Sequence, residues 1–160
     1  MKTIEKEQFC RLIREQETSM YRYALGMLKN PADAEDAVGE TVLKAYAHLA
    51  QLRKPERFQS WVMSILTNEI RTMASRRSRV DLTEDMSRYG QSAPEGDRSL
   101  WYLVMELPKE FRDVVILFYY DGFQTKEIAH MLKLSEGTVK SRLCRARGKL
   151  KTALEKGEGL

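Results

Sequence analysis

The sequence predicts an all-α protein, built as two small helical domains joined by a flexible linker. Apolar residues recur at helical spacing over most of the chain, whereas strand-like alternation of convincing length is absent. The helical periodicity fails from Val80 to Arg98, where the chain is polar and acidic and contains Gly90, Pro94 and Gly96. Such a stretch is typical of a linker. A chain of 160 residues is long enough to bury a core in one domain or in two small ones.

The first predicted domain, residues 1–79, contains three helical patterns. Residues 5–29 carry apolar side chains at helical spacing. The second pattern begins with Asn30 as its N-cap, Pro31 at the first helical position and acidic residues in the first turn. After a short loop, the third pattern starts near Phe58 and ends in the basic sequence SRRSR.

The second predicted domain, residues 99–160, ends in a helix-turn-helix. Pro108 opens one helix, and Gly122 is placed to stop it. Thr125 is then placed to cap a short helix, the sequence KLS makes a tight turn, and Ser135 caps the next helix.

The last predicted helix separates into a buried side and an outward side. Its apolar residues fall on a single stripe, made of Val139, Leu143, Ala146 and Leu150. The outward positions are Thr138, Lys140, Ser141, Arg142, Arg145 and Lys149. A basic helix face alone is usually a solvated surface. Together with the capped start and the short preceding helix, it favours a helix that lies in the major groove of DNA.

The charges are distributed unevenly along the chain, although the net charge is only +4. Residues 51–80 carry seven Lys or Arg against two Asp or Glu, and residues 124–160 carry nine against four. Between these basic blocks, residues 81–98 reverse to two against five. A long polyanion that touches the protein in two places suits this layout.

The composition argues against several other classes of protein. No apolar run approaches the roughly 20 residues that a membrane span needs, and the first residues have no signal-peptide core, so we expect a cytoplasmic protein that does not insert into the membrane. Cys10 and Cys144 are far apart and are expected to be reduced thiols. Glu127 and His130 match the Glu-x-x-His spacing of di-metal helical bundles, but the second copy is absent. We therefore expect neither a metal nor another cofactor.

Three stretches in order resemble the extracytoplasmic-function sigma factors of bacterial RNA polymerase, which are group IV of the sigma-70 superfamily. The family's promoter-binding region 4 resembles LPKEFRDVVILFYYDGFQTKEIAHMLKLSEGTVKSRLCRARGKL, its region 2.2 resembles DAEDAVGETVLKAY, and its regions 2.3 to 2.4 resemble RFQSWVMSILTNEIRTMASRRSR. The resemblance runs from about residue 16 to 154. It implies a noncatalytic protein that brings RNA polymerase core to promoter DNA and uses no small-molecule substrate. It also implies an anti-sigma factor as a partner, often tethered to the membrane.

The family's region 4 implies which residues meet the −35 promoter element. The base-facing positions are Lys140, Ser141, Cys144 and Arg145. The positions on the DNA backbone are Thr138 and Arg142, with Lys126 near a phosphate.

The family's region 2 implies that the first basic block reads the −10 element. Asn68 matches an asparagine at the surface where an unpaired base is captured, and the loop from Arg53 to Ser60 matches the loop that holds such a base. Trp61 could stack on a base, although its apolar neighbours at helical spacing favour a place in the core. The residues expected to hold phosphates are Arg71, Arg76, Arg77 and Arg79. Thr72 stands where the family commonly has an aspartate.

The family's region 2.2 implies a docking face for the coiled coil of the polymerase β′ subunit. Asp33, Asp36 and Glu40 share one side of a helix, with Glu35 flanking them. Only one of these acids has a lysine four positions later, so the face suits a basic partner. Acids near a helix N-terminus also stabilise the helix dipole, which could alone explain two of them. Gly39 stands where the family usually has a glutamine.

Two other functions stay open from the residues alone. A stand-alone helix-turn-helix regulator would bind DNA without acting through polymerase core, but it would usually dimerise and would leave the first domain without a role. A small helical metal-dependent phosphohydrolase could use Asp33, Asp36 and Glu40. The sequence contains no nucleophile–base constellation and no phosphate-cradling glycine loop, so we expect no enzyme.

Overall fold

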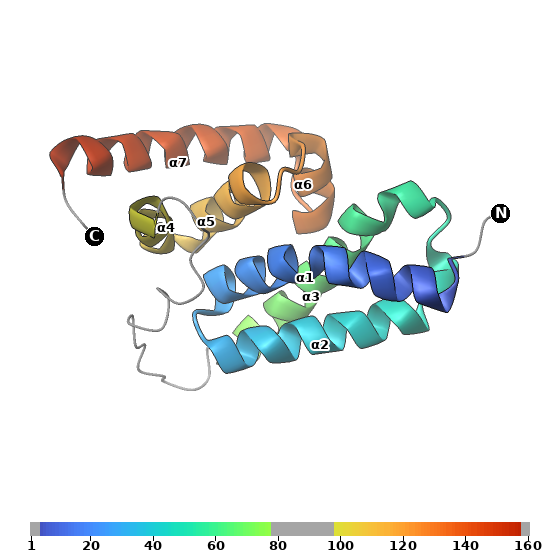
Figure 1. Cartoon of the computed structure of the whole chain (residues 1–160). Helices are drawn as coiled ribbons and strands as arrows, with labels where there is room; N and C mark the ends of the chain where they lie inside the picture. Colours follow the sequence, from blue (N-terminus) through green and yellow to red (C-terminus); the bar gives the residue numbers. More distant parts are fainter. Residues whose placement is uncertain (1–3, 78–97, 158–160) are drawn as a thin grey trace.

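The helices form two lobes, one from each half of the chain (Figure 1). The computed structural model describes residues 4–77 and 98–157. The first lobe contains α1 (Lys6–Leu28), α2 (Pro31–Ala47), η1 (Leu49–Gln51), η2 (Pro55–Arg57) and α3 (Phe58–Arg77). The second lobe contains α4 (Arg98–Met105), α5 (Lys109–Val115), η4 (Ile116–Tyr120), α6 (Thr125–Leu132) and α7 (Glu136–Lys156). All regular elements within these ranges are helical, which confirms the predicted fold class.

The linker expected at residues 80–98 lies outside the described residues, except for Arg98, which begins α4. The prediction of a flexible connection is therefore not addressed by the described part of the chain.

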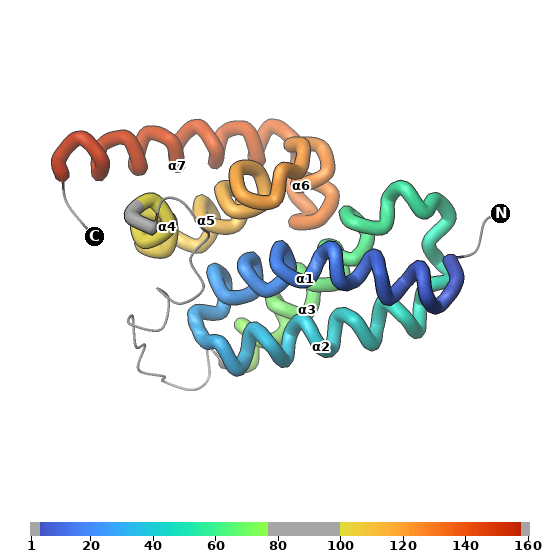
Figure 2. Tube along the Cα trace, viewed as in Figure 1, coloured from blue at the N-terminus to red at the C-terminus, as the bar shows by residue number. Residues whose placement is uncertain are grey.

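The first lobe is built on a sharp reversal between α1 and α2. Lys29 adopts the left-handed conformation with φ 54°, and its N–H donates to the carbonyl of Leu25. The side chain of Asn30 then accepts from the N–H of Asp33 at 3.1 Å, with Pro31 next in the chain, as predicted. The reversal sets α1 and α2 side by side, and α3 packs against both (Figure 2).

In the second lobe, α5 continues directly into η4, a π-helical turn that ends before Gly122. Gly122 has φ 76°, a conformation that glycine adopts without strain, so the predicted stop is confirmed. The predicted cap of α6 was wrong by one position. Gln124, and not Thr125, is the N-cap residue with an extended backbone, and its N–H donates to Oε1 of Glu127 at 3.0 Å. The hydroxyl of Thr125 instead donates to Glu136 of α7.

The apolar side chains of both lobes meet in one continuous core. Trp101 of α4 is fully buried, and α1 packs against α5 and η4, while α3 packs against α6. The sequence allowed Trp61 either a place in the core or a role in stacking on a base. Trp61 is half-buried, and its ring centroid lies 6.0 Å from that of Phe58. The lobes are thus two helical units that share an extensive contact.

Candidate nucleic-acid interface and docking face

The start of α7 is set by a short, capped turn after α6. Lys133 ends α6 in the left-handed conformation with φ 57°. Two residues later, the hydroxyl of Ser135 accepts from the N–H of Thr138 at 3.1 Å, which confirms Ser135 as the N-cap. The cap fixes the direction in which the first turn of α7 leaves the lobe.

The two sides of α7 differ sharply in exposure. Val139, Leu143 and Ala146 are buried, with at most 2% of their surfaces exposed, and they hold the helix to its own lobe. Leu150, the last residue of the predicted stripe, is half-buried. The predicted base-facing residues are all exposed, namely Lys140, Ser141, Cys144 and Arg145. The predicted backbone-contacting residues Thr138 and Arg142 are half-buried, and Lys126 is exposed on α6.

Glu136 lies within this basic surface and was missed by the sequence reasoning. Its Oε1 accepts from the hydroxyl of Thr125 at 2.9 Å, and Lys140 lies 3.5 Å from the same oxygen. The hydroxyl bond and the nearby ammonium hold the pKa of the Glu136 carboxyl below its usual value. The signal available in the sequence was the i, i+4 spacing of Glu136 and Lys140.

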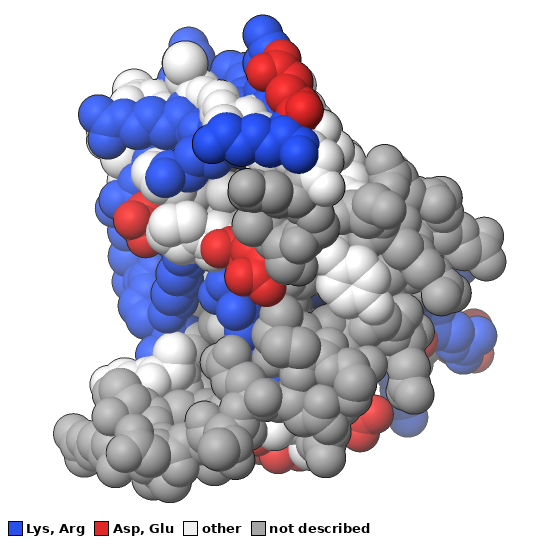
Figure 3. Space-filling model, turned by 90° about the vertical axis from the view of Figure 1, so that its left-hand side faces the viewer, with Lys and Arg blue, Asp and Glu red and all other residues white. Residues whose placement is uncertain are grey.

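Lys and Arg side chains gather over the upper lobe, where α7 lies, and continue along one edge toward the lower lobe (Figure 3). This distribution suits an extended polyanion. The residues predicted to contact the −10 element differ in their surroundings: some are simply exposed, and others contact the end of α6.

Arg53 is exposed between η1 and η2, and Arg76 is exposed near the end of α3. Asn68 is exposed and lines a shallow pocket together with the turn after α6. Arg71 donates from Nη2 to the carbonyl of Leu132 at 3.4 Å. The remaining two residues of the predicted set are Arg77, which ends α3, and Arg79, which lies outside the described residues.

An acidic groove runs between α1, α2 and α3. Glu35, Asp36 and Glu40 line it, together with the apolar Leu43, which is 66% exposed. Asp33 does not line it and is half-buried in the first turn of α2. The structure therefore brings together three of the four predicted docking acids.

Two further acids in the groove were missed, Glu17 of α1 and Glu69 of α3. Glu69 forms an ion pair with Lys44 of α2. This pairing takes Lys44 away from Glu40, four residues before it in the same helix. In the described ranges, no three His, Cys, Asp or Glu side chains are grouped as metal ligands.

Comparisons with known proteins identify the family of this chain. The Sigma-70 region 2 model matches residues 12–80, and the Sigma-70, region 4 model matches residues 97–150. The ECF RNA polymerase sigma factor SigL of Mycobacterium tuberculosis is 36% identical over 136 residues, which cover 78% of this chain and 76% of SigL. The chain belongs to the extracytoplasmic-function (ECF) sigma factors.

This sigma factor also has more distant relatives. The probable RNA polymerase sigma factor RfaY of Xanthomonas campestris pv. campestris is 28% identical over 163 residues, which cover 93% of this chain but only 41% of RfaY. Among solved structures, the sigma factor RpoE of Bartonella quintana, in complex with the anti-sigma factor NepR, matches with a TM-score of 0.75 at 24% identity, over 91% of this chain and 97% of RpoE. That likeness shows the shared fold.

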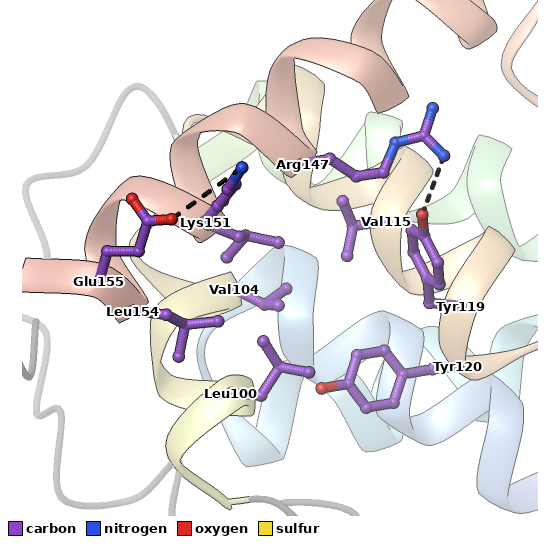
Figure 4. A pocket seen from close by; sticks show the side chains of 10 residues that line it. Leu100, Val104, Val115, Tyr119, Tyr120, Arg147, Lys151, Leu154 and Glu155 are labelled. Carbon is purple, nitrogen blue, oxygen red and sulfur yellow. Dashed lines mark hydrogen bonds and ion pairs between the residues drawn. The ribbon is translucent and has the colours of Figure 1, made fainter. Parts of the chain in front are cut away.

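The second lobe of the sigma factor also has an apolar groove between α4, η4 and α7 (Figure 4). Tyr119 and Leu154 line it and are 49% and 54% exposed. Arg147 closes one end by donating to the hydroxyl of Tyr119 at 3.1 Å.

Within residues 4–77 and 98–157, none of the helices has the length and apolar character to cross a membrane.

Proposed function

We propose that this sigma factor directs RNA polymerase core to specific promoters and aids their opening, without making or breaking a covalent bond itself. The proposal rests on the difference in exposure between the two sides of α7. A buried stripe anchors the helix to its lobe, and the residues that the family uses for reading DNA are exposed on the other side. We take residues 1–79 and 99–160 as the two functional units, with residues 80–98 as the linker.

For the −35 element, we propose that α7 enters the major groove. Lys140, Ser141, Cys144 and Arg145 would face base edges, because they are exposed along the outward side of the helix. Thr138 and Arg142 lie at the margins of that side, where phosphates run, and Lys126 reaches the backbone from α6.

For the −10 element, we propose that the first lobe captures an unpaired base at Asn68 and at the segment that begins with Arg53. The exposed Arg53 is free to approach single-stranded DNA, and capture of a base outside the stack costs a few kcal/mol that such a site can offset. The proposed phosphate contacts are Arg71, Arg76, Arg77 and Arg79.

For polymerase core, we propose that the acidic groove receives the β′ coiled coil. Glu35, Asp36 and Glu40 supply the negative charge, and the exposed Leu43 supplies an apolar contact at the same place. Asp33, one turn before Asp36, stays a predicted contact. We add Glu17 to the proposed face because it is exposed and lines the same groove. Glu69 lines the groove too, but it is buried and paired with Lys44.

We further propose that an anti-sigma factor binds this protein and holds it in check, because the similar fold of RpoE from Bartonella quintana forms a complex with the anti-sigma factor NepR. The place of action would be the cytoplasm, where core polymerase meets DNA, and a membrane-tethered anti-sigma factor would hold the protein near the membrane. No cofactor, metal or small-molecule substrate is required by this mechanism.

Run-off transcription with purified core polymerase tests the proposal. Core polymerase with this chain should initiate at a discrete set of promoters from a genomic library, and core polymerase alone should not. A stand-alone regulator would instead bind duplex DNA tightly and fail to co-purify with core. That outcome would refute the sigma-factor assignment of this chain.

A further inference from the structure

Glu136 is an acid in the first turn of α7, among the cations that are proposed to meet DNA. Its side chain is 44% exposed. Val139 and Leu143, three and seven residues later, are buried, so Glu136 lies at the margin between the buried and the outward sides of the helix. When a helix occupies the major groove, the DNA backbone runs along such margins. An acid at this place repels phosphates, and its presence calls for a specific role.

The carboxylate of Glu136 is held from a second helix. Its Oε1 accepts from the hydroxyl of Thr125, the first residue of α6, at 2.9 Å. Nζ of Lys140, four residues later in α7, lies 3.5 Å from the same oxygen. The Thr125 hydroxyl, followed by the Lys140 ammonium, lowers the pKa of this carboxyl, so Glu136 is charged at neutral pH. The carboxylate thus joins the two helices of the helix-turn-helix and fixes a negative charge beside Lys140.

Stabilisation of α7 accounts for only part of this arrangement. A negative charge at a helix N-terminus favours the helix dipole, and a Glu–Lys pair four residues apart supports a helix. The start of α7 is already capped by Ser135, which accepts from the N–H of Thr138 at 3.1 Å. Neither effect requires the bond from Thr125, which comes from another helix and sets the position of the carboxylate from outside α7.

The position of the Lys140 ammonium decides what kind of contact it makes. A lysine side chain is flexible, and its ammonium binds either a backbone phosphate or the O6 and N7 atoms of a guanine. Phosphate contacts carry no sequence information, whereas base contacts do. A fixed carboxylate at the margin of α7 restrains the ammonium and repels the nearby phosphates. Both effects favour a base edge over the backbone as the partner of Lys140.

We propose that Glu136 is a specificity-determining residue of the −35 reader, which positions Lys140 toward a base edge and disfavours phosphate contacts by the same part of α7. The inference rests on the proposed function, because that function places Lys140 at the base edges. Glu136 acts through Lys140 and is itself positioned by Thr125. It lowers the affinity for DNA of any sequence and raises the part of the affinity that depends on sequence.

Binding of the full chain to fluorescent duplex DNA at low salt, without polymerase, measures both effects. A randomised duplex library gives the sequence that the unaltered chain prefers, and each base pair of that sequence is then changed singly. Lys140→Ala identifies the base pair that Lys140 reads, as the position where discrimination is lost. Glu136→Gln keeps the size of the side chain and an acceptor for Thr125, but it removes the charge.

Glu136→Gln should reduce discrimination at the base pair read by Lys140 on the order of fivefold. The same variant should bind duplexes of unrelated sequence more tightly than the unaltered chain. Its plot of log affinity against log salt should be steeper by up to about one unit of slope, because Lys140 becomes available to one more phosphate. Tighter binding together with poorer discrimination is a result that simple loss of helix stability cannot give.

Two further sets of variants serve as controls. Thr125→Val removes the bond from α6 but leaves the charge, so it should reduce the same discrimination by a smaller factor, and Thr125→Ser should restore it. Glu155→Gln is the matched control, because Glu155 lies 4.0 Å from Lys151 in another exposed pair of α7 with the same spacing. It should leave discrimination unchanged. Circular dichroism of each variant reports whether its helices remain.

Several results would overturn the proposal. Glu136→Gln could bind preferred and unrelated duplexes equally weakly, which is the mark of a purely structural role, or it could leave discrimination at the base pair of Lys140 unchanged. A library without a preferred sequence, or Lys140→Ala without lost discrimination, would overturn it together with the base-reading role of Lys140. The run-off assay is independent: discrimination that depends on Glu136 without transcription would refute the sigma-factor function alone, and transcription with no effect of Glu136→Gln on discrimination would refute this inference alone.

Discussion

Substitution of Asp121 would measure the free-energy cost of burying its carboxylate at the contact between the lobes. Its side chain is 0% exposed and accepts from Arg22 at 2.6 Å. Burial raises the pKa of this carboxyl to about 6, although hydrogen bonds from Arg22 and Ser19 oppose the rise. The substitution Asp121→Asn keeps the size of the side chain and an acceptor oxygen but removes the titration.

The expected magnitude follows from the change in pKa from 3.8 to about 6. At about 1.4 kcal/mol for each pKa unit, the difference is about 3 kcal/mol. The native protein binds this proton more tightly than the unfolded chain does, so the stabilisation is fully present below the unfolded pKa and is lost as the pH rises through about 6. The free energy of unfolding of the unaltered protein, minus that of Asp121→Asn, should therefore increase as the pH falls from neutral toward the unfolded pKa.

Urea unfolding followed by circular dichroism, repeated across this pH range for both proteins, gives the difference directly. Asp36→Asn, made at an exposed position of α2, is the control for the chemical change itself. A difference between the unaltered protein and Asp121→Asn that stays flat with pH would refute the reasoning. It would mean that the attraction of Arg22 fully offsets the loss of hydration, so that folding leaves the pKa of Asp121 unchanged.

Three further predictions concern the surfaces. Arg145→Ala should relax discrimination at one position of the −35 element by about 1–3 kcal/mol in competition binding to mutated promoters, whereas Arg147→Ala, on the same helix but bonded to Tyr119, should leave it unchanged. Reversal of charge at Asp36 and Glu40 together should weaken binding to core polymerase but not the affinity for duplex −35 DNA; an equal loss of both would count against a docking face. Gly39→Ala should raise the free energy of unfolding by about 1 kcal/mol in a urea titration, since its Cβ would meet nothing within 4 Å, and no gain would contradict that expectation.

Much of the fold was predictable because the signals that start and stop its helices are local. Asn30 and Ser135 each accept from a backbone N–H three residues later, so both ends of that interaction are visible in the sequence. Gly122 could be placed for the same reason, because its left-handed backbone depends on its own lack of a side chain. The buried side of α7 followed from periodicity alone.

The candidate site was less predictable. Periodicity indicates which side of a helix is exposed, but it does not indicate which side chains of other helices contact that side. The one lysine spaced to pair with Glu40 binds Glu69 of another helix instead. Thr125 has the chemistry of a cap, yet its hydroxyl bonds to Glu136, eleven residues away. The contact between Arg22 and Asp121 spans 99 residues and has no local signature.

Arg71 shows why such a long-range contact matters for the proposed function. On the sequence alone it is one of a row of arginines expected to hold phosphates. In the structure its guanidinium donates to a carbonyl at the end of α6, where the helix dipole is equivalent to roughly half a negative charge. A phosphate carries a full negative charge and accepts stronger, charge-assisted hydrogen bonds from a guanidinium. The carbonyl of Leu132 is therefore a weaker ligand for the exposed Arg71 than the phosphate that Arg71 is proposed to bind, so a phosphate can replace it.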